Sequence, residues 1–213
     1  MSSELDLSKK LFEDGISLMN RGLLIQAANK FIEASNYILN MKEVDEESRL
    51  LLVKSLINQG AIMINLGKFA LAINSLLKSW QILKNGDNPM LLKATYINLI
   101  NAFIATKRFN EANSFIKKLE NIDEESKAYA LLFRSKILIE SNNTNDVLKY
   151  LEEAKSIFLK YGFKDQAAAV IATQAEYYFL IENKEKANEK IKEIKEIIGE
   201  DADKMLKNVR ACT

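Results

Sequence analysis

The sequence contains no histidine, one cysteine, one proline and seven glycines among its 213 residues. Without histidine, neither a Ser-His-Asp nor a Cys-His catalytic arrangement can form, and zinc sites of the HExxH type are excluded. The single cysteine, Cys212, lies next to the last residue, where a frayed chain end positions a nucleophile poorly. Phosphate-binding glycine loops are also absent. We therefore expect a protein that is not an enzyme and uses no cofactor or metal.

Long apolar segments and a charge imbalance are missing as well. No apolar run approaches the roughly 18 residues of a membrane-spanning helix, and no secretory signal pattern is found. The 30 basic and 29 acidic residues give a formal net charge of +1. This balance disfavours nucleic acid and anionic membranes as partners. Together with the lone cysteine, these features predict a cytoplasmic protein without a membrane partner.

A repeated helical pattern is the most informative feature that is present. A small residue is followed four positions later by a large apolar residue, and seven positions later by another small or apolar residue. The leading residues of the five occurrences are Ala27, Ala72, Ala112, Val147 and Ala187, with spacings of 45, 40, 35 and 40 residues. Such periods are typical of stacked helical repeats.

The pattern extends upstream of each leading residue. Twelve positions earlier lie Gly15, Gly60, Ile100, Ser135 and Ala175, and offsets of three and four place further apolar residues on the same helical face. Each unit is therefore predicted to be a pair of antiparallel helices. Small residues are needed where two helix backbones come closest. We expect Gly15 to contact Ala27, and Gly60 to contact Ala72.

Residues near the ends of the predicted helices support this interpretation. Asp45, Asn88 and Asp123 are candidate N-caps, and Pro89 suits a first helical position. The pairs Asn85-Gly86 and Tyr161-Gly162, and also Gly199, predict helix ends, because glycine accepts the left-handed conformation found there.

These patterns resemble the tetratricopeptide repeat, which combines a glycine on its first helix with alanine and an aromatic residue on its second, over about 34 residues. The matching residues are Gly15, Gly22, Ala27 and Phe31 in the first repeat, Gly60, Gly67, Phe69 and Ala72 in the second, and Phe109 and Ala112 in the third. The fourth and fifth repeats are degenerate, the proline that usually closes the second helix is absent, and most periods are longer than usual.

The resemblance implies an all-α, right-handed α-solenoid of about five helix pairs in a single domain, residues 1–213. The expected repeats cover residues 5–43, 45–86, 88–121, 123–161 and 163–198. A short amphipathic helix at residues 200–211 is expected to cap the last repeat, because terminal repeats need a polar outer face.

The resemblance also implies that a ligand binds the face of each first helix that points away from the second helix. The residues expected to bind a protein or peptide there are Phe12, Ile16, Met19, Lys54, Ile57, Asn58, Asn65, Ile97, Asn98, Asn101, Tyr129, Phe133, Lys136 and Phe179. This face is more apolar than a solvent-facing helix requires, which is typical of an interaction surface. Alternatively, the long helices bury the apolar stripe against one another.

Two asparagines occupy equivalent positions in adjacent repeats, Asn58 and Asn98. A primary amide both donates and accepts hydrogen bonds, so such amides suit the backbone of an extended peptide. The resemblance implies this role, because asparagine ladders bind ligand backbone in related proteins. The alternative is that these amides are simply solvated. An unliganded ladder would leave both side chains without intramolecular partners.

We therefore expect a non-enzymatic adaptor that binds a protein or peptide and is a monomer or homodimer. Two other functions stay open. One is a structural subunit of a larger or self-associating complex. The other is a nucleic-acid-associated regulator, which the near-zero net charge and the lack of a helix-turn-helix module disfavour.

Overall fold

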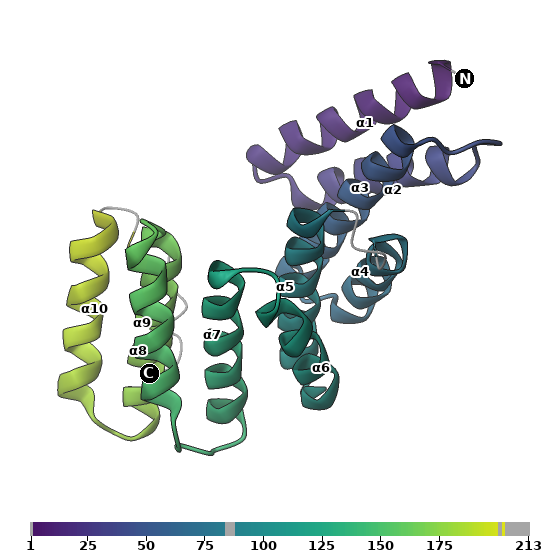
Figure 1. Cartoon of the computed structure of the whole chain (residues 1–213). Coiled ribbons are helices and arrows are strands. Elements are labelled where there is room, and N and C mark those ends of the chain that lie inside the picture. Colours follow the sequence, from purple (N-terminus) through teal and green to yellow (C-terminus); the bar gives the residue numbers. More distant parts are fainter. Residues whose placement is uncertain (1, 84–87, 200–201, 203–213) are drawn as a thin grey trace. The chain divides into compact units, whose positions relative to one another are not determined.

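The structure is a computed structural model that describes residues 2–83, 88–199 and 202. These residues form ten helices and no strands (Figure 1). The helices are α1 (Ser2–Asn20), α2 (Leu24–Leu39), α3 (Glu46–Asn65), α4 (Phe69–Leu83), α5 (Pro89–Ala105), α6 (Phe109–Glu120), α7 (Glu124–Glu140), α8 (Val147–Lys160), α9 (Lys164–Leu180) and α10 (Lys184–Ile198). The expected all-α class is confirmed. The expected capping helix at 200–211, apart from Ala202, and the helix end at Asn85-Gly86 lie outside the described residues.

Consecutive helices pack against each other, as the repeat pattern predicts. Contacts join α1 with α2, α3 with α4, α7 with α8, and α9 with α10. The stacked rings of Phe103 and Phe115 join α5 with α6. Each of these pairs matches one of the five expected repeats, although α1 begins at Ser2, before the expected start at residue 5.

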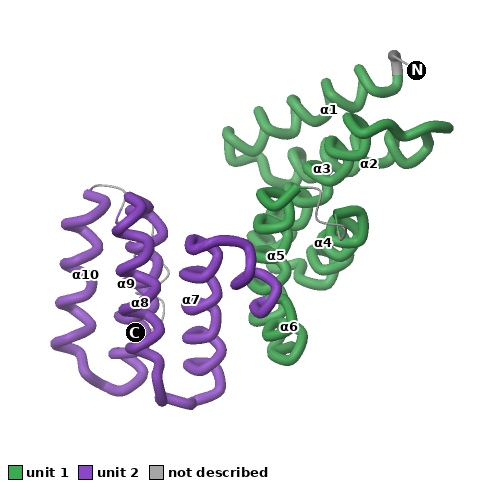
Figure 2. The backbone as a smooth tube through the Cα atoms, in the orientation of Figure 1, with its two compact units in different colours: residues 1–115 green, residues 116–213 purple. Residues whose placement is uncertain are grey.

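The chain forms two compact units, shown in green and purple in Figure 2. Unit 1 comprises Met1–Phe115 and unit 2 comprises Ile116–Thr213, so the boundary falls inside α6. Within unit 1, α3 contacts both α1 and α5, while α2 and α4 each contact the first helices before and after them. Within unit 2, α8 packs between α7 and α9, and α10 packs on α9. The single-domain organisation stays a prediction.

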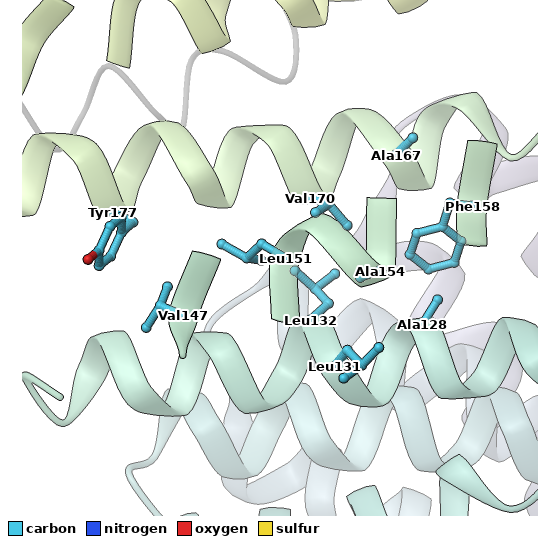
Figure 3. Close-up of a cluster of buried hydrophobic side chains, with 10 residues drawn as sticks. All are labelled: Ala128, Leu131, Leu132, Val147, Leu151, Ala154, Phe158, Ala167, Val170 and Tyr177. Atoms are coloured by element: carbon cyan, nitrogen blue, oxygen red, sulfur yellow. The ribbon is translucent and has the colours of Figure 1, made fainter. Parts of the chain in front are cut away.

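The five leading residues of the sequence pattern are all completely buried. Ala27, Ala72, Ala112, Val147 and Ala187 each have 0% exposure. This burial confirms that the repeated pattern marks contacts within the helix pairs. The core of unit 2 illustrates it in Figure 3, where Val147, Leu151 and Ala154 of α8 lie between side chains of α7 and α9.

The two glycines of the first helices have different closest partners from those expected. A Cβ atom added to Gly15 would lie 2.8 Å from Cε1 of Phe31, and one added to Gly60 would lie 2.5 Å from Cγ of Leu76. The nearest neighbour is thus the large apolar residue four positions after the leading alanine. Glycine is needed there because the side chain from the second helix rests directly on its backbone.

The first helix of every repeat ends in the same way. A residue with positive φ follows each first helix: Gly22 (74°), Gly67 (69°), Lys107 (56°), Asn142 (52°) and Glu182 (59°). The longer fourth turn has a second such residue, Asp146 (60°). In the second repeat, the amide of Gly67 donates to the carbonyl of Ile64 at 2.9 Å, and the amide of Lys68 donates to that of Met63 at 2.8 Å. The other four turns carry the same two bonds. This is the Schellman arrangement, which satisfies carbonyls at a helix end.

The predicted N-caps are confirmed. The carboxylate of Asp45 accepts from the amide of Ser48 at 2.8 Å, and that of Asp123 accepts from the amide of Ser126 at 2.7 Å. Hydrogen bonds from Ser48 lower the pKa of Asp45. Asn88 caps α5 in the same way. Gly162 and Gly199 follow α8 and α10 with positive φ, as expected.

Candidate functional site

Helix geometry divides the surface of α3 into two opposite sides. At about 100° per residue, Lys54, Asn58, Ala61 and Asn65 lie on one side. We call this side, together with the equivalent sides of α1 and α5, the first-helix face of unit 1. It points away from the contacts that α3 makes with α4 through Gly60. The predicted ligand residues of unit 1 lie on or beside this face.

The predicted site residues differ in exposure. Lys54 and Asn65 are exposed, and the partly buried residues are Phe12, Ile16, Met19, Asn58, Ile97, Asn98, Asn101, Tyr129, Lys136 and Phe179. Two are buried: Ile57 is 7% exposed and Phe133 only 2%. Little of their surface is open to a ligand, because a first helix with more than one packing face buries apolar residues around most of its circumference. Their assignment as ligand contacts stays a prediction.

Three of the aromatic candidates are packed into their own units. The ring of Phe12 meets Phe31 edge-on at 5.4 Å, and the ring of Tyr129 meets Phe158 edge-on at 5.0 Å. Phe179 packs against the buried cluster that includes Ala175 and Ile194. These contacts hold the rings in position, and part of each side chain stays exposed.

The asparagines of unit 1 fit the expected ladder in part. Nδ2 of Asn98 donates to the carbonyl of Ala94 in its own helix at 2.9 Å. The expectation that Asn98 lacks an intramolecular partner is therefore wrong, because an amide within a helix can bond to the carbonyl one turn earlier. Within the described part of the chain, no hydrogen bond is formed by the side chain of Asn58 or Asn101. Both amides remain available.

In unit 2 the equivalent of Asn101 is a charged pair, Lys136 on α7 and Glu176 on α9. Burial lowers the pKa of Lys136, and the nearby charge of Glu176 opposes this change. Burial likewise raises the pKa of Glu176, with Lys136 lowering it and Glu140 raising it further. Glu176 also belongs to the face of the fifth repeat that is expected to bind a ligand, and its 40-residue spacing from Lys136 identifies an equivalent repeat position.

Two further properties concern the described residues only. None of their helices is long and apolar enough to cross a membrane. They also contain no group of three or more histidine, cysteine, aspartate or glutamate side chains placed to hold a metal ion.

Comparisons with known proteins give a likeness in fold. No family model and no curated protein matches the sequence. The structure is similar to the crystal structure of a thermophilic TPR protein from Thermus thermophilus, with a TM-score of 0.69 and 16% sequence identity, covering 96% of this chain and 98% of that one. The tetratricopeptide-like fold expected from the sequence is confirmed.

Proposed function

We propose that this protein is an adaptor that binds an extended peptide segment of a partner protein on the first-helix face of unit 1. The observation that carries the proposal is the free amide of Asn58, which lies among partly buried apolar side chains of three adjacent first helices. A tetratricopeptide-like fold supports an interaction role by analogy.

The proposed chemistry combines two kinds of contact. Neighbouring helices pack about 8–10 Å apart, and an extended chain repeats its side-chain direction every two residues, or about 6.6–6.8 Å. Asn58 and Asn98 on adjacent helices would therefore pair with backbone groups two to three residues apart. Ile16, Ile64 and Ile97 would then receive the apolar side chains of the ligand.

The test begins with peptides selected from a phage-displayed random library on the immobilised protein. We expect the double variant N58A/N98A to weaken the selected peptides by about 1–3 kcal/mol, because hydrogen bonds to a buried backbone are lost. Titration calorimetry measures this change. The matched control is Asn113→Ala on α6, an exposed amide outside the face, which should bind normally.

Two results would contradict the proposal. Unchanged affinity of the double variant for every selected peptide would remove the amides from recognition. A stable dimer in light scattering, with an interface above about 1,000 Å² that covers the face, would favour the structural-subunit alternative instead.

A further inference from the structure

A second recessed surface lies on the opposite side of α3. It is a hollow of about 270 Å³, which we call the α2–α4 hollow. Its lining residues are Ile32, Ser35, Asn36, Leu39, Leu56, Gln59, Met63, Leu71, Asn74, Ser75 and Lys78. On α3, the lining residues Leu56, Gln59 and Met63 lie about 100–180° around the helix from Asn58 and Asn65. The hollow is therefore separate from the first-helix face.

The hollow has an apolar floor and an apolar rim. Leu56 and Met63 are 5% and 7% exposed and form the floor from α3. Leu39 on α2 and Leu71 on α4 stand at the opening with 58% and 53% of their surface exposed. Large aliphatic side chains left this exposed on both walls of one recess are typical of an interaction surface.

Three primary amides supply the polar groups of the hollow. In the described part of the structure, the side chains of Asn36, Gln59 and Asn74 form no hydrogen bond within the protein. The two serine hydroxyls are occupied: Ser35 donates to Phe31 at 2.8 Å, and Ser75 donates to Leu71 at 3.2 Å. The amides are thus the polar side chains left free for a ligand, with one donor and one acceptor group each.

Charge distinguishes one end of the hollow. Lys78 is the one charged residue among the described side chains that line it. An acidic group on a ligand is therefore favoured at this end, and a basic group is repelled.

We propose that the α2–α4 hollow binds an extended segment of a partner protein in which a branched aliphatic residue lies next to an aspartate or glutamate. The aliphatic side chain would enter between Leu39 and Leu71, and the acidic group would pair with Lys78. The volume of about 270 Å³ is at the lower end of small-molecule sites, roughly 300–1,000 Å³, and so fits a few side chains of a bound segment. A helical ligand already satisfies its own backbone groups and would leave the three amides unused.

This second surface would make unit 1 bivalent. Because Asn58 and Gln59 lie about 100° apart around α3, and Leu56 and Met63 lie still farther from Asn58, a ligand on one side leaves the other side accessible. The inference stands independently of the proposed function, since the two surfaces share no ligand residue.

The test uses the same phage-displayed random peptides, now selected on the N58A/N98A variant so that ligands of the first-helix face are disfavoured. We expect the enriched peptides to carry an aliphatic residue beside an acidic one. Gln59→Ala should weaken them about tenfold, which corresponds to roughly 1.4 kcal/mol. Asn65→Ala, on the first-helix face of α3 and unchanged in the selection variant, is the matched control and should leave their affinity unchanged.

Charge reversal gives a second readout that does not depend on the amides. The variant Lys78→Glu should select peptides with a basic residue in place of the acidic one, whereas Lys54→Glu on the first-helix face should not. Circular dichroism spectra of both variants report whether they fold.

Three outcomes would overturn the inference. The first is that the Gln59→Ala and Lys78→Glu variants bind the enriched peptides as tightly as the protein without these substitutions does. The second is helical circular dichroism of the bound peptides, which would mean a different ligand class. The third is a dimer in light scattering that Leu39→Lys dissociates, because the occupant would then be a second copy of the chain.

Discussion

The second repeat and the two repeats of unit 2 are all pairs of helices, but the contact between the two helices of a pair differs. In the second repeat, Gly60 lets Leu76 rest on the backbone of α3. The equivalent first-helix residues in unit 2 are Ser135 and Ala175, both completely buried, and each has a side chain. The fourth and fifth repeats therefore keep the helix pairing although a side chain stands where Gly60 opens its backbone to Leu76. The repeat geometry tolerates several residue combinations at this contact.

In unit 2, polar side-chain contacts also join neighbouring helices. Arg134 on α7 donates to the carboxylate of Glu120 at 2.9 Å, and Gln174 on α9 donates to Glu152 at 2.7 Å. Gln59 holds the same repeat position on α3 but lines the α2–α4 hollow. A position that joins neighbouring helices in unit 2 is thus left open in the second repeat, whereas the third repeat has the buried Leu99 there. This contrast distinguishes a surface available to a partner from one used for internal packing.

The largest effect is expected for Gly60→Ala. In an exposed helix, alanine stabilises relative to glycine by about 1 kcal/mol, but here its Cβ would overlap Leu76. We expect a loss of about 2–3 kcal/mol in the free energy of unfolding, measured by urea denaturation. Ser135→Ala is the comparison, since it keeps a Cβ at the equivalent contact and removes only the hydroxyl that bonds to the carbonyls of Leu131 and Val147. A stabilised Gly60→Ala variant would show that the contact relaxes freely.

The charged pair of unit 2 should give the next effect. Glu176→Leu leaves Lys136 partly buried without its opposite charge, and we expect a loss of about 1–2 kcal/mol. This is less than the roughly 3–5 kcal/mol of fully buried pairs, because both side chains are partly exposed. The double variant K136M/E176L should recover most of the loss. Additive losses in this double-mutant cycle would mean that the two groups act independently.

The repeat architecture follows directly from sequence because burial of small residues at fixed spacing leaves a readable pattern. All five leading residues, from Ala27 to Ala187, are buried as predicted. The exposure of the first-helix side chains was harder to predict. Ile57 and Phe133 are buried because each first helix has more than one packing face, which periodicity within one helix does not reveal. The bond from Asn98 to Ala94 is likewise local and leaves no pattern.

The pH dependence of stability offers a further test of Glu176. Its folded-state pKa is raised by burial, so its contribution to stability is fully present below the unfolded pKa of about 4.3 and is lost as pH rises through the folded pKa. The stability of the wild type relative to Glu176→Gln should therefore fall as pH rises from about 4. Glu140→Gln should reduce this fall, because Glu140 raises the pKa of Glu176. If the difference in stability between the wild type and Glu176→Gln did not vary with pH, the assignment of Glu176 as buried would be wrong.

The smallest effects are expected in the repeated turns, where the two units can be compared residue by residue. Glu182 has φ of 59° in the turn of the fifth repeat, and Gly67 has φ of 69° in that of the second. A non-glycine residue pays about 1 kcal/mol for this conformation, so Glu182→Gly should stabilise and Gly67→Ala should destabilise, each by roughly 0.5–1 kcal/mol. Thermal denaturation of the two variants measures both changes. If both substitutions changed the stability in the same direction, local helix propensity would dominate at both sites. That result would contradict the inference that one strained backbone position recurs in every repeat.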